Sequence, residues 1–233
     1  MSAAEGGWRT FGPSAVPFGD LDAPRQADRA DLDEVVEAFA RAARMAHLAG
    51  YQVVEIQASH GYLLHEFLSP LSNHRTDEYG GSLRNRTRLA LRVARAVREA
   101  FPAEKAVFVR ITATDWVEGG VGIDEAVAFA EELAAVGIDL LDVTSGLAVR
   151  DHEARPPTRE GVHVEFAARL KDATGLAVAA GQIGDVSLAG ELVASGQVDA
   201  VMTGRPLLHD PYFALRARPA DQAAWPHQYR RAL

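Results

Sequence analysis

Residues 57–83 hold the largest concentration of side chains that could do chemistry. Histidine and tyrosine side chains donate hydrogen bonds and exchange protons in enzymes. A connection of this length between regular elements is usually functional. We therefore expect the chemistry to centre on this loop, whose polar residues and glycine pair include His60, Tyr62, His65, His74, Arg75, Asp77, Tyr79 and Gly80–Gly81.

A second candidate is Arg110, which stands alone inside the apolar run Val107–Ile111. A run of this kind predicts a strand, and a charge buried in a strand needs a partner. One possible partner is a bound group that carries negative charge. The other is a neighbouring Asp or Glu, in an ion pair inside the fold. The sequence leaves both open.

The elements that must position these residues alternate between helices and strands. After an irregular lead-in, Asp31 and Glu34 have the spacing of a capping box, which predicts a helix from Asp31 to Gly50. Apolar periodicity predicts four more helices and a last helical stretch near Pro206. The four helices cover about 84–100, 123–136, 163–173 and 186–195, and the strands about 51–56, 106–111, 139–143, 176–179 and 199–202.

This alternation predicts right-handed βαβ units and a parallel sheet. An open doubly wound sheet can stop at five strands, whereas a TIM (β/α)8 barrel needs eight, in roughly 250 residues. Neither GxGxxG nor GxxxxGK[ST] follows a predicted strand, so an open nucleotide-binding sheet loses its usual support. We expect an α/β fold, an incomplete TIM barrel of five βα units.

Glycines follow the last two predicted strands, where many barrels bind phosphate. Gly181–Gln182 follows one strand, and Gly204–Arg205 follows the next. Glycine lets backbone N–H groups approach a phosphate, and an arginine adds a charge-assisted contact. These four residues are therefore candidate cofactor contacts.

A long ordered match then points to a family. Val54–Leu63 (Val-Glu-Ile-Gln-Ala-Ser-His-Gly-Tyr-Leu), Phe67–Pro70 and Asn73–Ser82 together resemble the signature loop of the Old Yellow Enzyme family, which contains FMN-dependent ene-reductases. Gly204-Arg-Pro-Leu-Leu208, followed by Asp210-Pro-Tyr212, is also similar to the family. The resemblance covers nearly the whole chain.

The resemblance implies roles for three loop residues. Family members carry two polar residues, three apart, that donate hydrogen bonds to the substrate carbonyl and stabilise the developing enolate. Here the pair is Gln57 and His60, with Gln57 in place of the usual first histidine. An amide donates a hydrogen bond but carries no positive charge. Tyr62 matches the proton donor, because a phenol with a pKa near ~10 is protonated at neutral pH.

The resemblance also implies cofactor contacts. Arg110 matches the arginine at the N1/O2 edge of the flavin, where it would stabilise the anionic reduced ring. Ser145 and Gly146 are expected to line the flavin edge. Arg231 matches a C-terminal arginine that, in one subgroup, reaches into the active site of the neighbouring subunit. An ordinary solvated terminal arginine is the alternative.

The implied activity passes hydride from NAD(P)H through FMN to an alkene conjugated to a carbonyl, while Tyr62 supplies the proton. In the family three βα units precede the matched part, so we expect a homo-oligomer or a partner chain that carries them. Five strands alone would leave two edges and an apolar inner face uncovered. Two alternatives remain: a non-catalytic or degenerate barrel subunit, favoured by Gln57, and a flavin-free phosphate-binding barrel enzyme.

Composition limits the other classes. The 233 residues are 48% hydrophobic with a formal net charge of −8, which argues against nucleic acid and anionic membranes as partners. The absence of cysteine excludes disulfides and Cys-ligated metals, and we expect no metal site. We expect a cytoplasmic protein with a lead-in (1–30), a partial FMN-binding barrel (31–218) and a C-terminal tail (219–233).

Overall fold

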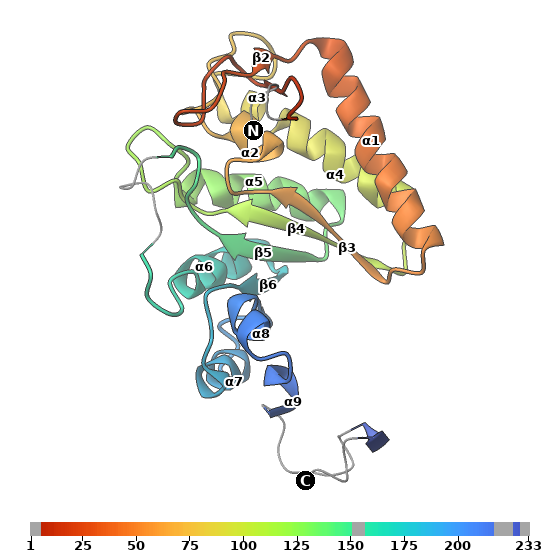
Figure 1. The fold of residues 1–233 in the computed structure, drawn as a ribbon, viewed down its shortest axis with the longest axis vertical. Coiled ribbons are helices and arrows are strands. Elements are labelled where there is room, and N and C mark those ends of the chain that lie inside the picture. Colours follow the sequence, from red (N-terminus) through yellow and green to blue (C-terminus); the bar gives the residue numbers. More distant parts are fainter. Residues whose placement is uncertain (1–5, 151–156, 217–225, 229–233) are drawn as a thin grey trace.

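The computed structural model describes residues 6–150, 157–216 and 226–228. A parallel sheet runs through the middle of the molecule, and the chain progresses across it from the first strand to the last (Figure 1). Its strands, in spatial order, are β3 (Val53–Ala58), β4 (Ala106–Thr112), β5 (Leu140–Thr144), β6 (Ala177–Ala180) and β7 (Ala200–Val201). The five predicted strands are confirmed within about two residues.

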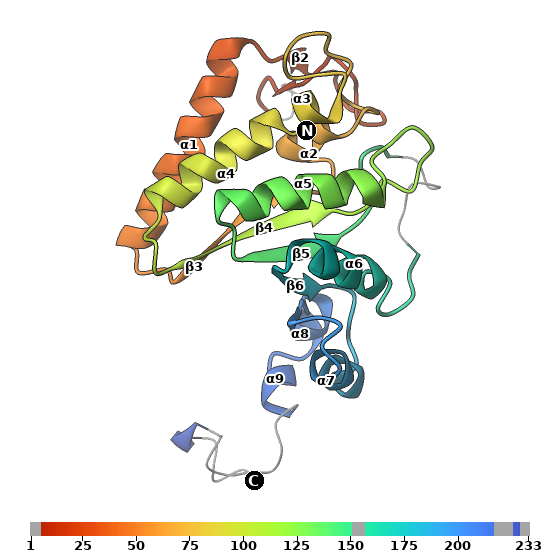
Figure 2. The ribbon, with the colours of Figure 1, turned by 180° about the vertical axis from the view of Figure 1, so that it is seen from behind.

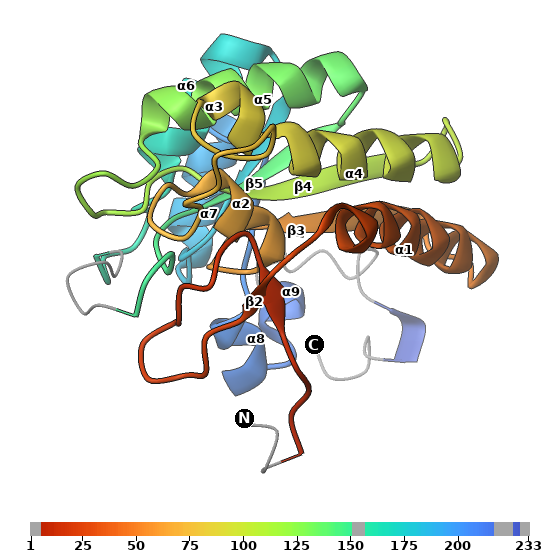
Figure 3. The same cartoon turned by 90° about the horizontal axis from the view of Figure 1, so that it is seen from above.

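Four helices cover one face of this sheet. α1 (Arg29–Leu48) packs on α4 (Arg88–Ala100), α4 on α5 (Ile123–Val136), and α5 on α6 (Val164–Thr174). Seen from behind, α4, α5 and α6 lie over the strands (Figure 2), and from above the four helices form an arc outside the sheet (Figure 3). The short elements α7 (Val186–Ala194), α8 (Arg205–His209) and α9 (Phe213–Arg216) follow β6 and β7.

The start of α1 corrects the predicted cap. Asp28, not Asp31, is the N-cap residue. The Asp31 backbone N–H donates to the Asp28 carboxylate at 3.0 Å, and the Asp28 N–H donates to the Asp31 carboxylate at 2.8 Å. Asp31 thus supplies the returning half of the capping box, which the prediction had assigned to Glu34. The far end is as predicted, because Gly50 follows the C-cap Ala49 with φ +89°.

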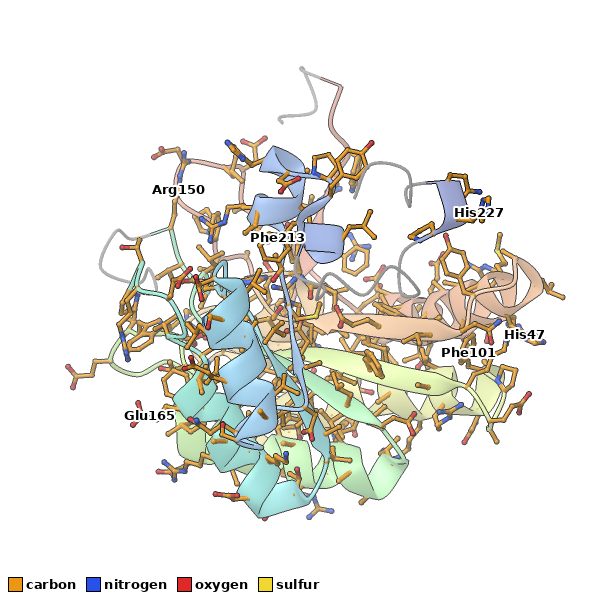
Figure 4. All side chains as sticks on the ribbon, turned by 90° about the horizontal axis from the view of Figure 1, so that it is seen from below. His47, Phe101, Arg150, Glu165, Phe213 and His227 are labelled. Atoms are coloured by element: carbon orange, nitrogen blue, oxygen red, sulfur yellow. The ribbon has the colours of Figure 1, made fainter. Side chains whose placement is uncertain are left out.

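Two short helices interrupt segments that were predicted as loop or as one helix. α2 (Leu63–Leu68) lies inside the long loop, and α3 (Leu83–Arg86) is separated from α4 at Thr87. The lead-in also contains paired strands, β1 (Phe11–Gly12) and β2 (Arg25–Gln26). At the opposite end of α4, Phe101 lies edge-on to His47 of α1, with ring centroids 6.3 Å apart (Figure 4).

The two faces of the sheet differ in chemistry. The helix-covered face is apolar and closed, with Ile56, Val107 and Leu141 at most 3% exposed. On the other face Gln57, Arg110 and Asp142 lie in register on adjacent strands. The predicted apolar inner face is therefore interrupted by this polar row, whereas Val53, nearer the start of β3, is apolar and 41% exposed.

The sheet is open in the part of the chain that the structure describes. β3 and β7 each pair with one neighbour, so each presents an edge. No helix in residues 6–150, 157–216 and 226–228 is long and apolar enough to cross a membrane. The proposed division at residues 30 and 218 stays a prediction, and much of the expected tail lies outside the described residues.

Candidate active site

Backbone strain gathers at the carboxyl ends of the strands. Four non-glycine residues in the described ranges have φ between 58° and 70°, a left-handed conformation that side chains disfavour. One follows each of four adjacent strands, and they are His60, Trp116, Leu147 and Gln182. Strained residues of this kind cluster at functional sites. In barrels this is also the end where catalysis occurs.

A cavity of about 740 Å³ opens at the same end. Its volume falls within the range of about 300–1,000 Å³ typical of small-molecule sites. It brings together six of the predicted site residues, which come from the ends of four strands and from the start of α8. They are His60, Arg110, Gly181, Gln182, Gly204 and Arg205.

Arg110 reaches this cavity from the inner face of β4. The sequence left two partners open for it, a bound anionic group and a neighbouring carboxylate, and the structure contains the carboxylate. Its Nε lies 3.0 Å from Oδ2 of Asp142, whose side chain is fully buried. Yet Nε and both Asp142 oxygens lack a hydrogen bond with suitable geometry. Burial raises the pKa of Asp142, and Arg110 lowers it in part. Burial and Asp142 likewise raise the pKa of Glu55 on β3. Arg110 and Asp142 therefore form an ion pair, but their buried polar atoms still lack hydrogen bonds of suitable geometry.

His60 occupies the strained turn after β3. Its Nε2 is 2.8 Å from Thr144 Oγ1, and its backbone N–H donates to Thr112 Oγ1 at 3.3 Å. Burial, followed by the charge of Arg110, lowers the pKa of His60 to about 4. The ring is therefore neutral near pH 7. It can act as a polar hydrogen-bonding group and not as a standing cation.

Gln57 is oriented by its neighbour in the loop. The Ser59 hydroxyl donates to Gln57 Oε1 at 3.1 Å and lies 3.4 Å from His60 Nδ1. Because the carbonyl end of the amide faces Ser59, its NH₂ end is left to donate elsewhere. Gln57 is not among the cavity-lining residues, but it is the register partner of Arg110, which is.

Three other predicted residues in the described ranges are not brought to the cavity wall. Tyr62, at the N-cap of α2, is 62% exposed. Ser145 and Gly146 are buried after β5, and the Gly146 N–H donates to the Thr114 carbonyl at 2.7 Å. Arg231 lies outside the described residues. Their roles stay predictions.

A buried histidine and aspartate hold the loop that carries His60. The Gly61 N–H donates to His65 Nδ1 at 2.8 Å, so His65 Nε2 carries the proton and donates to Asp115 at 2.9 Å. Ser69 and the Val121 N–H donate to the other Asp115 oxygen. Burial raises the pKa of Asp115, but these hydrogen bonds, His65 first, lower it below its usual value.

The later part of the loop is held to the lead-in. The Asn73 amide donates to the carbonyls of Phe67 and Tyr79, and Arg75 donates to the carbonyls of Pro13 and Ala27. Gly61 has φ +71°, and a Cβ there would come within 2.2 Å of the Leu147 carbonyl oxygen, so the loop packs directly on the chain after β5. Asn73 and Arg75 therefore fix the shape of the loop after α2.

The sequence reasoning missed two buried polar residues near the cavity. Asp142 stands in an apolar strand as Arg110 does, so the same argument about buried charge could have found it. His163 lines the cavity from the start of α6 and is 2% exposed. It lies at the start of the helix predicted over about 163–173, and apolar periodicity marks that helix without marking the polar side chain at its start.

Comparison with known proteins identifies the family to which this fold and cavity belong. Residues 18–222 match the model of the NADH:flavin oxidoreductase / NADH oxidase family. The chain belongs to this family. The resemblance to Old Yellow Enzyme is thereby confirmed, and FMN and NAD(P)H are the cofactors that the family implies.

Curated relatives of the chain include two NADPH dehydrogenases. The Bacillus subtilis protein is 41% identical over 210 residues, covering 89% of this chain and 60% of the relative. The Listeria innocua protein is 38% identical over 224 residues, covering 94% and 65%. The chain thus spans less than two thirds of the length of these relatives.

Solved structures agree on the fold. 2-Naphthoyl-CoA reductase, in complex with 2-naphthoyl-CoA, matches 91% of this chain and 33% of its own with a TM-score of 0.81 at 30% identity. Morphinone reductase in complex with tetrahydroNAD matches 91% and 61%, with a TM-score of 0.71 at 26% identity. The fold class is confirmed as that of TIM-barrel flavin oxidoreductases, here with five parallel strands in the described residues.

Proposed function

We propose that the cavity binds FMN and that the whole protein is an NAD(P)H-dependent ene-reductase. The observation that carries the proposal is the arrangement of Arg110 and Arg205, two cations from distant parts of the chain that line one cavity. A flavin mononucleotide has an anionic phosphate and, when reduced, an electron-rich pyrimidine edge. Two separate cationic contacts suit a ligand with those two ends.

The residues present fit FMN by an independent criterion. Buried polar atoms in proteins are nearly always hydrogen-bonded. Here Nε of Arg110, the oxygens of Asp142 and Nδ1 of His163 have no hydrogen-bond partner. Arg110 and His163 line the cavity, so a polar ligand there would complete them. At the other end, Gly204 and Arg205 would hold the phosphate by backbone N–H groups and a guanidinium.

When bound, FMN would supply the hydride transfer between NAD(P)H and the β-carbon of an alkene conjugated to a carbonyl. Arg110 would stabilise negative charge at the pyrimidine edge. The NH₂ of Gln57 and the neutral ring of His60 would hydrogen-bond the substrate carbonyl oxygen, stabilising the enolate as charge develops. Tyr62 would hold the proton delivered to the α-carbon, which requires its exposed side chain to turn toward the site.

The test is a coupled spectroscopic assay. Purified protein should show a bound-flavin absorbance band that bleaches with NADPH and recovers on addition of a cyclic enone. A saturated cyclic ketone is the matched control and should not restore the band. Flavin that bleaches but recovers equally with the ketone would contradict the ene-reductase activity and leave flavin binding intact.

The open sheet supports an assembly with further βα units, either through self-association or through a partner chain. An eight-stranded closure fixes strand number, tilt and shear together, which five strands cannot satisfy. Exposed Val53 and the free edges of β3 and β7 are the surfaces that such units would cover. Arg231 would enter a neighbouring site in such an assembly. The acidic, cysteine-free composition is in keeping with a cytoplasmic enzyme.

Sedimentation of the 233-residue chain tests this assembly. We expect self-association, or a requirement for a partner, because exposing a few hundred Å² of apolar surface costs several kcal/mol at ~25 cal/mol per Å². That cost is comparable to the ~5–15 kcal/mol stability of a whole domain. A soluble monomer that binds FMN tightly would contradict the assembly.

A non-catalytic barrel subunit is the second candidate. It is favoured by Gln57, which cannot carry charge, and by the 62% exposure of Tyr62 outside the cavity wall. Such a subunit would bind FMN without turnover of any enone. The enone assay therefore separates the two candidates directly.

A further inference from the structure

We propose that His163 is a binding residue for the cofactor, and that its Nδ1–H donates a hydrogen bond to an oxygen of FMN between the ring and the phosphate. The inference rests on the proposed FMN site. It assigns a specific proton position to a histidine that the sequence did not single out. Trp116 and Ser145 act as positioning residues for this ring.

A chain of hydrogen bonds lies behind His163. The Trp116 indole Nε1 lies 2.9 Å from Ser145 Oγ, and Ser145 Oγ lies 2.9 Å from His163 Nε2. Trp116 is held by an edge contact with Phe166 of α6, with ring centroids 5.7 Å apart. Ser145 and His163 are at most 2% exposed, so solvent does not replace these contacts.

The donor and acceptor chemistry of Trp116, Ser145 and His163 gives each of these hydrogen bonds a direction. An indole N–H only donates, so Ser145 Oγ accepts from Trp116. Within the described residues the Ser145 hydroxyl has no other acceptor for its own proton, so we assign it as the donor to His163 Nε2. Burial, the largest cause, lowers the pKa of His163 to about 4, so the ring is neutral at pH 7 and carries one proton. With Nε2 accepting, that proton is on Nδ1.

The other ring nitrogen of His163 is Nδ1. This atom is buried beside the Gly181 backbone, whose proximity raises the pKa of His163 in part. It makes no hydrogen bond at suitable geometry within the protein. The site of a Cβ on Gly181 would be 3.8 Å from it. Gly181 needs no left-handed backbone, since its φ is outside the positive range. Its missing side chain therefore leaves the donor open toward the cavity that both residues line.

The residues around His163 indicate which group of the ligand it contacts. His163 and Gly181 line the cavity together with Arg110 and with Gly204 and Arg205. The pyrimidine edge is assigned to Arg110 and the phosphate to the other two. The acceptor left for a neutral donor is an oxygen in the polyol part of the flavin nucleotide.

The experiment measures FMN affinity by quenching of flavin fluorescence. We expect His163→Phe to weaken binding about tenfold, the effect of leaving a buried polar contact unmade. Trp116→Phe, which keeps the ring against Phe166 but removes the N–H, should weaken it by a smaller factor. The control His74→Phe changes an exposed histidine outside the cavity and should leave the affinity within about twofold.

A second pair of variants keeps the test decisive if His163→Phe folds poorly. Gly181→Ala places a methyl group over Nδ1 at ordinary contact distance. It should weaken FMN binding in the parent and add nothing in the double variant with His163→Phe, because both changes remove one interaction. Full additivity would overturn the proposal.

The proton position is read separately by ¹⁵N NMR of the imidazole in the flavin-free chain. We expect the Nδ1–H tautomer of His163, and a finding of Nε2–H would overturn the proposal. A parent that is folded and assembled with the completing βα units but binds no FMN would refute the proposed function and this inference together. A parent that binds FMN equally well with Phe at position 163 would refute the inference alone.

Discussion

Two regions at the carboxyl edge of the sheet differ in how their buried polar groups are satisfied. Beside the loop after β3, every hydrogen-bonding atom of the His65 and Asp115 side chains has a protein partner. Toward β5 and β6, the buried atoms of Arg110, Asp142 and His163 retain unmet hydrogen-bonding capacity. Both regions contain buried ionisable groups within one family fold.

This contrast separates scaffold from site. A polar network that is complete within the protein rigidifies the backbone around it, and here it fixes the strained turn at His60. A network that ends in unpaired buried atoms is costly unless a ligand completes it. We therefore expect changes in the first region to act on stability, and changes in the second to act on ligand binding.

The largest effect should come from Asp115→Ala. The substitution leaves three buried donors without an acceptor, and at about 1–3 kcal/mol for each unsatisfied group the loss is roughly 3 kcal/mol or more. Urea unfolding measures it. Asp172→Ala, which removes an exposed carboxylate from α6, is the control and should change the midpoint little. A loss below about 1 kcal/mol would show that the network is not a scaffold.

Arg205→Ala should act on the other region. Removing a charge-assisted phosphate contact weakens FMN binding by about tenfold to a hundredfold, so the variant should lose cofactor on dialysis. Its unfolding midpoint should stay near that of the parent, because Arg205 is exposed. Arg169→Ala, an exposed arginine on α6, is the control. Unchanged FMN occupancy in Arg205→Ala would remove this residue from the site.

His60→Ala should weaken the binding of phenols, which mimic the enolate, by about tenfold. The measurement is the charge-transfer band that phenols usually give with oxidised flavin. Gln57→His should raise the rate of enone reduction, since a second imidazole restores the family pair. His47→Ala, at an exposed position on α1, is the control. Intact phenol binding in His60→Ala would make the assignment wrong.

A smaller effect should appear in how the folding stability depends on pH. Burial lowers the pKa of His60 and His163 from 6.5 to about 4, so the unfolded chain binds more protons than the folded one between these values. Stability from each histidine is complete above pH 6.5 and falls as the pH drops toward 4. Thermal midpoints across this window should fall less steeply in His163→Gln than in the parent.

Glu66 should change the folding stability with pH in the opposite direction. Burial raises its pKa from 4.5 to about 7, so the folded chain holds a proton that the unfolded chain releases. Its contribution is complete below pH 4.5 and is lost as the pH rises toward 7. Glu66→Gln should remove that loss. An unchanged slope in either variant would show that the group does not titrate as the structure implies.

The sequence was most informative where periodicity and family motifs coincide. The strand and helix order, the open parallel sheet and the convergence of His60, Arg110, Gly181, Gln182, Gly204 and Arg205 on one cavity could all be predicted. Arg110 was found because a lone charge in an apolar strand has few explanations. The same argument about a buried charge in an apolar strand applies to Asp142, which is the register partner of Arg110 on β5.

Features that depend on contacts distant in sequence could not be predicted. The cap of α1 lies at Asp28 because Asp28 and Asp31 bond reciprocally, a choice that spacing alone does not make. The position of Ser145 behind His163 depends on Trp116, in the connection after β4. Periodicity carries no information about such pairs, because the connections involved have no repeating apolar pattern.

The most direct test of the central claim is a crystal structure of the protein grown with FMN. The account predicts one flavin nucleotide in the cavity of about 740 Å³, with its ring edge at Arg110 and its phosphate at Gly204 and Arg205. His163 Nδ1 should then be hydrogen-bonded to the ligand. A flavin bound elsewhere, or bound with its phosphate at Arg110, would contradict the account.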